Sequence, residues 1–114
     1  MIARALVAES LKPFVLSILA EGERYGYEII QRIQDLTNCQ KQWTSGTLYP
    51  LLHSLEIKGL LASVWREREG GPKRKYYWLT AKGQKTLDVE KRQWLSVHAA
   101  LVRLWGPTPG LAPT

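Results

Sequence analysis

The sequence predicts a mainly α-helical fold with one small β-hairpin, which places the chain in the α+β class. Apolar residues recur every three or four positions through most of its 114 residues, the period of amphipathic helices. Two short runs, 60–66 and 74–80, instead alternate as strands do, on either side of a loop with two glycines and a proline. A last helical pattern spans 81–105. At this length we expect one domain with a modest core.

The N-terminal segment predicts an arm followed by a core helix. Residues 1–11 are weakly amphipathic and form either a frayed helix or an arm that becomes ordered against another subunit. Ser10 and Pro13 suit the first turn of the helix that follows, and Gly22 suits its end. Its expected buried residues are Phe14, Val15, Ile18 and Leu19.

A second core helix is predicted from Tyr25 to about Leu36. Its apolar stripe consists of Gly26, Ile29, Ile30, Ile33 and Leu36. Glycine is costly inside a helix unless another element packs closely against it. Gly26 therefore predicts that another helix crosses at this point.

The segment 43–59 predicts a third helix with two different faces. One side carries leucines: Leu48, Leu51, Leu52 and Leu55. The opposite side is small or polar and has no acid: Gly46, Thr47, Pro50, His53 and Ser54. Ser45, or Thr44 before it, is the expected N-cap, and Gly59 is the expected left-handed residue at the C-terminal end. A face without acidic residues can approach a polyanion, and this indicates a recognition helix, joined to the second helix as a helix-turn-helix.

The two alternating runs predict a β-hairpin with a basic tip. Leu61, Ser63 and Trp65 share one face of the first strand; in the second, Tyr77 and Leu79 share one face and leave Tyr76 and Trp78 on the other. Lys73, Arg74 and Lys75 lie beside the turn glycines, which allow the backbone to approach a surface closely. A basic hairpin directly after a recognition helix is typical of a wing. Residues 12–80 are therefore predicted to form a winged helix-turn-helix DNA-binding domain.

The segment 81–105 predicts a long C-terminal dimerisation helix, capped by Thr80. Its expected interface residues repeat at sevens: Leu87, Trp94, Val97, Leu101 and Leu104. At 1.5 Å per residue such a helix reaches about 37 Å, longer than the domain that carries it. We therefore expect a second subunit to cover it, although the helix could also fold back within one chain. Residues 106–114 are expected to be a disordered tail.

The charge is concentrated after the recognition helix. The chain carries a net charge of +6, but residues 1–58 have six basic and six acidic residues and sum to zero. Residues 59–82 hold six basic and two acidic residues, a net of +4. A localised basic strip beside a non-acidic helix favours nucleic acid as the partner.

The sequence argues against an enzyme, a metal site and a membrane protein. His53 and His98 lie on different helices without a matching acid or nucleophile nearby in sequence, and no glycine-rich phosphate loop appears. The single cysteine, Cys39, excludes an internal disulfide and a cysteine-based zinc site. We expect no cofactor and no metal. No apolar run is long enough to span a bilayer. With a single cysteine and no secretory h-region, the chain is expected to be cytoplasmic, and as a DNA-binding protein nucleoid-associated.

Several strings resemble the PadR family of bacterial transcriptional regulators. They are YGYEII (25–30), SGTLYPLLHSLEIKGLL (45–61), EGGPKRKYYWLTAKG (69–83) and the tryptophan-containing terminal helix. The resemblance covers residues 12–105 and implies a homodimer that binds a pseudo-palindromic operator and usually represses transcription. It implies DNA contacts by Tyr49 and by the wing lysines and arginine. Trp94 matches the position at which the short, multidrug-responsive members stack planar aromatic compounds between subunits.

These observations predict a DNA-binding homodimer, with double-stranded DNA as partner and a small aromatic effector as a candidate ligand. The candidate DNA-binding residues are Lys41, Ser45, Thr47, Tyr49, His53, Ser54, Lys73, Arg74, Lys75 and Tyr76. Trp94 and His98 are the candidate effector contacts, with packing in the helix seam as their alternative role. The competing hypothesis is a winged-helix protein–protein interaction module that uses Trp78 and the terminal helix and does not bind DNA.

Overall fold

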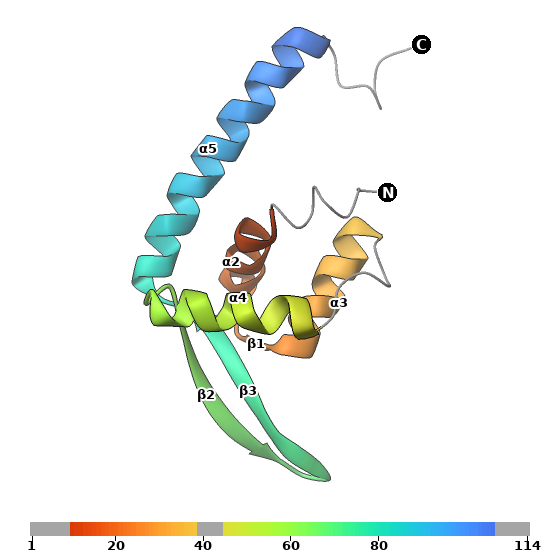
Figure 1. Ribbon diagram of the computed structural model, residues 1–114, viewed down its shortest axis with the longest axis vertical. Helices are drawn as coiled ribbons and strands as arrows, with labels where there is room; N and C mark the ends of the chain where they lie inside the picture. Colours follow the sequence, from red (N-terminus) through yellow and green to blue (C-terminus); the bar gives the residue numbers. More distant parts are fainter. Residues whose placement is uncertain (1–9, 39–44, 107–114) are drawn as a thin grey trace.

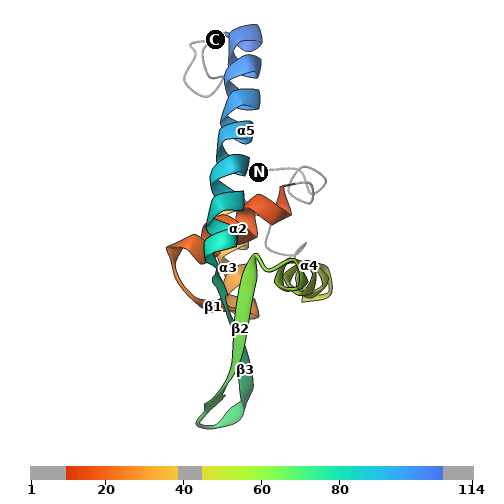
Figure 2. The same ribbon diagram turned by 90° about the vertical axis from the view of Figure 1, so that its left-hand side faces the viewer.

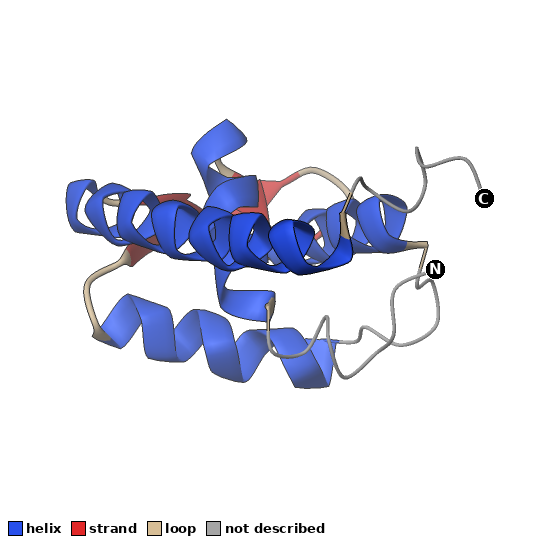
Figure 3. Ribbon diagram, turned by 90° about the horizontal axis from the view of Figure 1, so that it is seen from above, coloured by secondary structure: helices blue, strands red, loops and turns tan. Residues whose placement is uncertain are grey.

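The computed structural model describes residues 10–38 and 45–106 of the chain. Its elements are α2 (Leu11–Glu21), β1 (Arg24–Tyr25), α3 (Gly26–Thr37), α4 (Ser45–Ile57), β2 (Leu61–Arg68), β3 (Gly71–Leu79) and α5 (Ala81–Trp105). Helices α2, α3 and α4 form a body in the middle, from which the β2–β3 hairpin and α5 project in opposite directions (Figures 1 and 2). Seen from above, helices make up most of the molecule and the strands lie largely beneath them (Figure 3). The predicted α+β class, mainly helical with a winged helix-turn-helix arrangement, is confirmed.

The core lies where α2, α3, α4 and the start of the hairpin meet. It is built from Leu11, Val15, Leu16, Ile18, Leu19, Ile29, Ile30, Ile33, Leu48, Leu52, Leu55, Leu60, Leu61, Tyr77 and Leu87. The predicted apolar stripes supply most of these side chains. Phe14 was expected inside but is only half-buried.

Helix α3 starts at a capping box and ends differently from the prediction. The Tyr25 amide donates to the Glu28 carboxylate at 3.2 Å, which satisfies a backbone donor at the start of the helix. Gly26 is buried as expected, but Leu36 is 49% exposed. The buried residue at that end is Thr37, whose hydroxyl donates to the Ile33 carbonyl at 2.7 Å. The prediction that Leu36 is a core residue was wrong, because the body does not extend far enough to cover the last turn of α3.

The sheet has three strands, one more than predicted, in the order β1-β3-β2. Arg24 and Tyr25 pair with Tyr77 and Tyr76 of β3. Two residues carry no alternation in the sequence, so pattern analysis could not detect β1. Its pairing ties the base of the hairpin to the start of α3.

The hairpin is longer than predicted, and its turn is displaced toward residues 69–70. Gly70 adopts a φ of 75°, and β3 begins at Gly71 rather than Arg74. Lys75 lies opposite Trp65, and Arg74 lies opposite Arg66. Two of the three predicted tip residues therefore lie along a paired strand, away from the turn.

Helix α5 spans Ala81–Trp105, as predicted. Thr80 caps it, and its hydroxyl accepts a hydrogen bond from the Gly83 amide at 3.0 Å. Leu87 is fully buried in the core of its own chain, so its predicted place in a dimer interface was wrong. A heptad pattern records only that a position is apolar, and here the first apolar position packs against the body. Residues 91–100, in contrast, are all exposed.

Candidate nucleic-acid interface

The outward face of α4 is small and polar. Leu48, Leu52 and Leu55 are at most 2% exposed and fix the helix on the body. On the other side Ser45, Gly46, Pro50 and His53 are exposed, and Thr47 and Ser54 are half-buried. The predicted division of this helix into a leucine face and a non-acidic face agrees with its burial. Lys41 lies outside the described residues.

The C-terminal end of α4 follows the prediction for Gly59, which has a φ of 79°. The Gly59 amide donates to the Glu56 carbonyl at 2.9 Å, and the Leu60 amide donates to the Leu55 carbonyl at 3.0 Å. This pair of bonds is a Schellman motif, which satisfies the last carbonyls of a helix. It turns the chain directly into β2.

Tyr49 connects α4 to α3. An ideal Cβ at Gly26 would lie 2.6 Å from the Tyr49 Cζ and nearer still to its hydroxyl oxygen, so any larger residue would displace this ring. The prediction that Gly26 permits a close crossing is confirmed. Tyr49 remains 42% exposed, at the N-terminal end of α3. The neighbouring Tyr27 is 57% exposed, and its hydroxyl accepts from the Gln31 amide at 3.3 Å. Sequence reasoning missed Tyr27, although an aromatic residue outside the apolar stripe was a usable signal.

The three basic residues of β3 have different surroundings. The Lys73 ammonium is 3.6 Å from Glu67, and both side chains are largely exposed. Lys75 is more enclosed: its ammonium lies 3.4 Å from the Glu56 carboxylate and 5.4 Å from the centre of the Tyr77 ring. Arg74 lies over the Tyr25 ring at 4.2 Å. Lys73 is the freest of the three for a phosphate, because exposed ion pairs are weak.

A stack of cations and aromatic rings covers the outer face of the sheet. The rings of Tyr25 and Tyr76 meet edge to face with centroids 5.5 Å apart, and the Arg66 guanidinium lies 4.9 Å from the Tyr76 centroid. Arg66 also forms an ion pair with Glu23. The half-buried ring of Tyr76 helps to hold the hairpin against β1, and its contact with DNA stays a prediction.

Glu56 joins α4 to the hairpin. Its carboxylate accepts a hydrogen bond from the Ser63 hydroxyl at 2.6 Å and faces the Lys75 ammonium. The Ser63 hydrogen bond holds the pKa of Glu56 below its ordinary value, and the charge of Lys75 acts in the same direction. The side of the hairpin that carries Ser63 therefore faces α4.

Trp65 lies further out on this same side. It is 61% exposed and pairs across the strands with Lys75, whose ammonium lies 5.9 Å from the centre of the indole ring. An exposed tryptophan between the recognition helix and the hairpin turn was missed from the sequence. The sequence pattern places Trp65 on the same strand face as Ser63, but it does not show how far along the hairpin α4 covers that face.

The far half of α5 exposes an apolar surface. Trp94, Leu95 and Val97 are 43%, 65% and 54% exposed, and Leu104 is 82% exposed. Leu101 is half-buried. His98 is exposed rather than packed within the chain. Of these side chains, Trp94 lies beside the body, and Leu95, Val97, His98 and Leu104 are left exposed.

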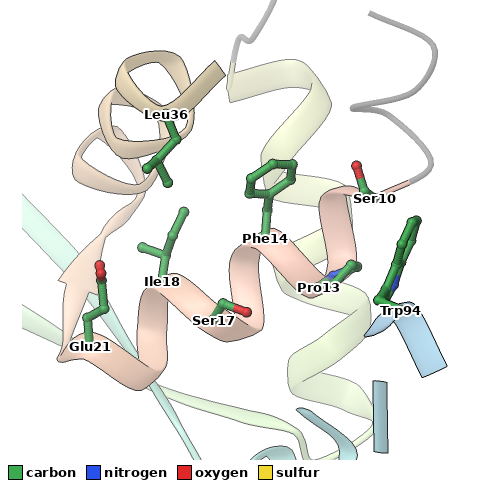
Figure 4. Close-up of a pocket in the computed structure, with 8 residues that line it drawn as sticks. All are labelled: Ser10, Pro13, Phe14, Ser17, Ile18, Glu21, Leu36 and Trp94. Atoms are coloured by element: carbon green, nitrogen blue, oxygen red, sulfur yellow. The ribbon is translucent and has the colours of Figure 1, made fainter. Parts of the chain in front are cut away.

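A pocket of about 320 Å³ lies between α2, the end of α3 and α5 (Figure 4). Its lining residues are Ser10, Pro13, Phe14, Ser17, Ile18, Glu21, Leu36 and Trp94. Glu21 at its edge is paired with Arg32 at 2.9 Å and with Arg24 at 3.1 Å, which leaves the rest of the lining mostly apolar. Of the two candidate effector residues, the structure brings Trp94 to this pocket and leaves His98 outside its lining.

Residues 10–38 and 45–106 contain no cluster of histidine, cysteine or carboxylate side chains suited to a metal ion. None of the helices in these ranges is long and apolar enough to cross a bilayer.

Comparison with known proteins identifies the family. Residues 15–89 match the model of the transcriptional regulator PadR-like family. A PadR-like transcriptional regulator from Bacillus cereus superposes with a TM-score of 0.79 at 28% identity, covering 91% of this chain and 99% of that one. A transcriptional regulator from Clostridium thermocellum superposes with a TM-score of 0.77 at 27% identity, covering 90% and 97% of the two chains.

The transcriptional regulator YqjI of Escherichia coli is a longer relative. It is 34% identical over 83 residues, which are 73% of this chain but 38% of YqjI. The chain thus spans well under half of that protein. Members of the matched family are regulators of transcription, which confirms the prediction that the chain is not an enzyme. The chain belongs to the PadR-like family of DNA-binding transcriptional regulators.

Proposed function

We propose that the chain forms a homodimer through α5 and represses transcription by binding a pseudo-palindromic operator in the bacterial cytoplasm. Membership of a family of transcriptional regulators supports the DNA-binding part of this proposal. The observation that carries the homodimer part is the uncovered apolar surface of α5, where Leu104 is 82% and Val97 is 54% exposed. Contiguous exposed apolar surface on a soluble chain marks an interface.

The interface would begin beyond Leu87, which the chain already buries. Trp94, Val97, Leu101 and Leu104 recur at spacings of three and four, so they lie along one side of α5. A two-fold dimer would place this side against its own copy and would continue onto the apolar pocket beside Trp94. Each α4 would then occupy a major groove, with half-sites about 34 Å apart.

The roles on DNA follow from exposure. Thr47, His53 and Ser54 on α4 would read base edges, while Ser45 and Tyr49 would contact the backbone near the helix start. Lys73 would be the main phosphate contact of the hairpin, because Lys75 is paired with Glu56 and Arg74 is stacked on Tyr25. Lys41 would add a contact before α4.

This function is tested by measuring the oligomeric state of the chain and by selecting the DNA fragments that it binds. Sedimentation of the purified chain at micromolar concentration should give a dimer, and genomic fragments selected by it should share an inverted repeat. If the dimer neutralises about six phosphates, the log–log slope of affinity against salt should be about −5. A monomer, or binding that does not change with salt, would contradict the proposal.

A small planar aromatic effector would act at the Trp94 pocket, whose lining is mostly apolar. It could release DNA only to the extent that it binds one arrangement of the two α5 helices better than another. Titration of phenolic acids and planar cations should quench tryptophan fluorescence in the native chain. The quenching should be absent in Trp94→Phe, while Trp78→Phe serves as the control that retains it.

One observation favours a second function, a surface for another protein. Trp78 and Val64 are 36% and 39% exposed on the outer face of the sheet, where Trp78 pairs with Ala62 and Val64 pairs with Tyr76. A gel shift with genomic fragments separates the hypotheses, because a module without DNA binding gives no salt-sensitive complex.

A further inference from the structure

The end of α4 and the start of α5 meet at one point, although 23 residues separate Ile57 from Ala81 in the sequence. The hairpin leaves and returns at the same place, since Leu61 pairs with Leu79. Figure 1 shows the end of α4, the start of α5 and both inner ends of the hairpin together at one edge of the body. This junction joins the recognition helix to the proposed dimerisation helix.

Three consecutive carbonyls at the exit of α4 are bound by residues at the entry of α5. The Lys82 ammonium donates to the Lys58 carbonyl at 2.8 Å. The Thr80 hydroxyl donates to the Gly59 carbonyl at 2.6 Å, and the Thr80 amide donates to the Leu60 carbonyl at 3.1 Å. Carbonyls at a helix exit need partners, and here the partners come from the next helix.

The Thr80 hydroxyl serves both helices. While it donates to Gly59, it also accepts from the Gly83 amide at 3.0 Å, the bond that caps α5. Gly83 closes the junction from the other side: an ideal Cβ there would lie 2.7 Å from the Leu79 Cδ1 and 3.0 Å from the Leu60 carbonyl carbon. The Leu60 carbonyl oxygen lies nearer still, and a backbone atom cannot move aside cheaply, so a Cβ has no room here and the first turn of α5 is pressed against the exit of α4.

We infer that Thr80, Lys82 and Gly83 are positioning residues that fix the direction of α4 relative to α5 and thereby set the half-site spacing that the dimer accepts. The inference rests on the proposed function. Helix α4, with 13 residues, is about 20 Å long, so a tilt of about 10° at the junction moves its far end by about 3.4 Å. That distance is one base-pair step. A loosened junction would therefore admit neighbouring spacings.

Matched substitutions separate this role from stability. Thr80→Ser keeps the hydroxyl and both of its hydrogen bonds, whereas Thr80→Val keeps the shape and loses them. Lys82→Met keeps most of the apolar stem and loses the ammonium. The full-length chain is used throughout, below the melting temperature of each variant, and dimerisation is checked by sedimentation.

The first readout is spacing discrimination. An operator selected by the native chain is rebuilt with one or two base pairs added or removed between its half-sites. The native chain and Thr80→Ser should bind the original spacing about tenfold or more tightly than the altered ones, a loss similar to that caused by one mismatched base pair. In the Thr80→Val/Lys82→Met double variant this ratio should fall to about threefold or less. Weaker binding with an unchanged ratio would overturn the inference.

The second readout does not need DNA. Spin labels at His53→Cys on α4 and Lys91→Cys on α5, in a Cys39→Ser background, report the distance between the two helices of one chain when diluted with unlabelled protein. Its distribution should widen in the double variant and stay narrow in Thr80→Ser. An unchanged width overturns the inference even if the protein binds DNA. Salt-insensitive binding by the native chain would instead refute the proposed function, and the width would still test the junction.

Discussion

The hairpin and the far half of α5 both project from the body, in opposite directions (Figure 2), but they satisfy their side chains differently. The base of the hairpin pairs its cations and rings within the chain, as the stack from Arg74 through Tyr25 and Tyr76 to Arg66 illustrates, although Trp65 further out is exposed. Along α5 the large apolar side chains have no such cover, and Leu104 is 82% exposed. The paired groups at the base of the hairpin need no second chain to cover them. The apolar side chains of α5 leave a surface that, in the proposed dimer, a second copy would cover.

A charge placed on the exposed apolar side of α5 tests the proposed dimer interface most directly. Val97→Asp should raise the dimer dissociation constant by at least about 100-fold, because an unpaired carboxylate would be buried in the interface. Operator binding should fall with it. Sedimentation and gel shift measure both effects. Ala99→Asp adds the same charge at an exposed position about 200° around the helix from Val97, on the opposite side, and should remain dimeric; equal behaviour of the two variants would refute an interface at Val97.

The hairpin should depend on its own stack rather than on a partner. Tyr76→Ala removes the ring that meets both Tyr25 and Arg66, and should lower the free energy of unfolding by about 1–2 kcal/mol. Chemical denaturation at several protein concentrations measures it. Tyr27→Ala, which removes an exposed tyrosine outside the stack, is the control with a smaller expected change. No difference between the two would show that the stack does not hold the hairpin.

Within the hairpin, the pairing of each lysine predicts its contribution to DNA binding. Lys73→Ala should reduce the magnitude of the log–log salt slope by about 1.8 per dimer, since each subunit loses one phosphate contact. Lys75→Ala should change it less, because the Lys75 ammonium is already 3.4 Å from Glu56. Fluorescence anisotropy with an operator duplex between 50 and 200 mM salt, roughly the range in which such slopes are measured, gives both values. A larger effect at Lys75 would reverse this assignment.

The smallest expected effect concerns acid stability at the base of the hairpin. The pKa of Glu56 is lowered by the Ser63 hydrogen bond and then by Lys75, so its contribution is present above the unfolded pKa, near 4.5. It should be lost as pH falls below that value toward the folded pKa. Melting temperatures of the native chain and Glu56→Gln should therefore differ at neutral pH and converge under acid. A constant difference across this range would mean that the charge of Glu56 contributes nothing.

Local rules predicted much of the fold. The limits of α5, the positive φ of Gly59 and the close packing at Gly26 followed from caps, periodicity and the special geometry of glycine. The sequence did not predict β1, since a two-residue strand has no period. It misplaced Leu36 and Leu87 because a helical stripe says that a residue is apolar without saying how far the body extends. Those errors arose where burial depends on the arrangement of distant elements.

The candidate site was predicted less completely than the fold. The polar face of α4 could be read from its spacing, but the pairing of Lys75 with Glu56 depends on how the hairpin folds back beside α4. Exposure of Trp65 depends on the same geometry. The contacts of Thr80 and Lys82 with the exit of α4 join residues 21 and 24 positions apart, and no local pattern announces them. The order of charges along the sequence therefore overstated how many basic side chains are free to contact DNA.

The Leu61–Leu79 pairing has one more consequence, which concerns how such a protein can change. Because the two strands begin and end at one pair of residues, Leu61 and Leu79, the length of the hairpin can change without moving the helices that it connects. Adding or deleting matched residues near Gly70 alters how far the loop extends along a duplex while α4 and α5 stay in place. The length of DNA that the hairpin contacts and the spacing of the two α4 helices can thus change independently among related regulators, or be engineered one at a time.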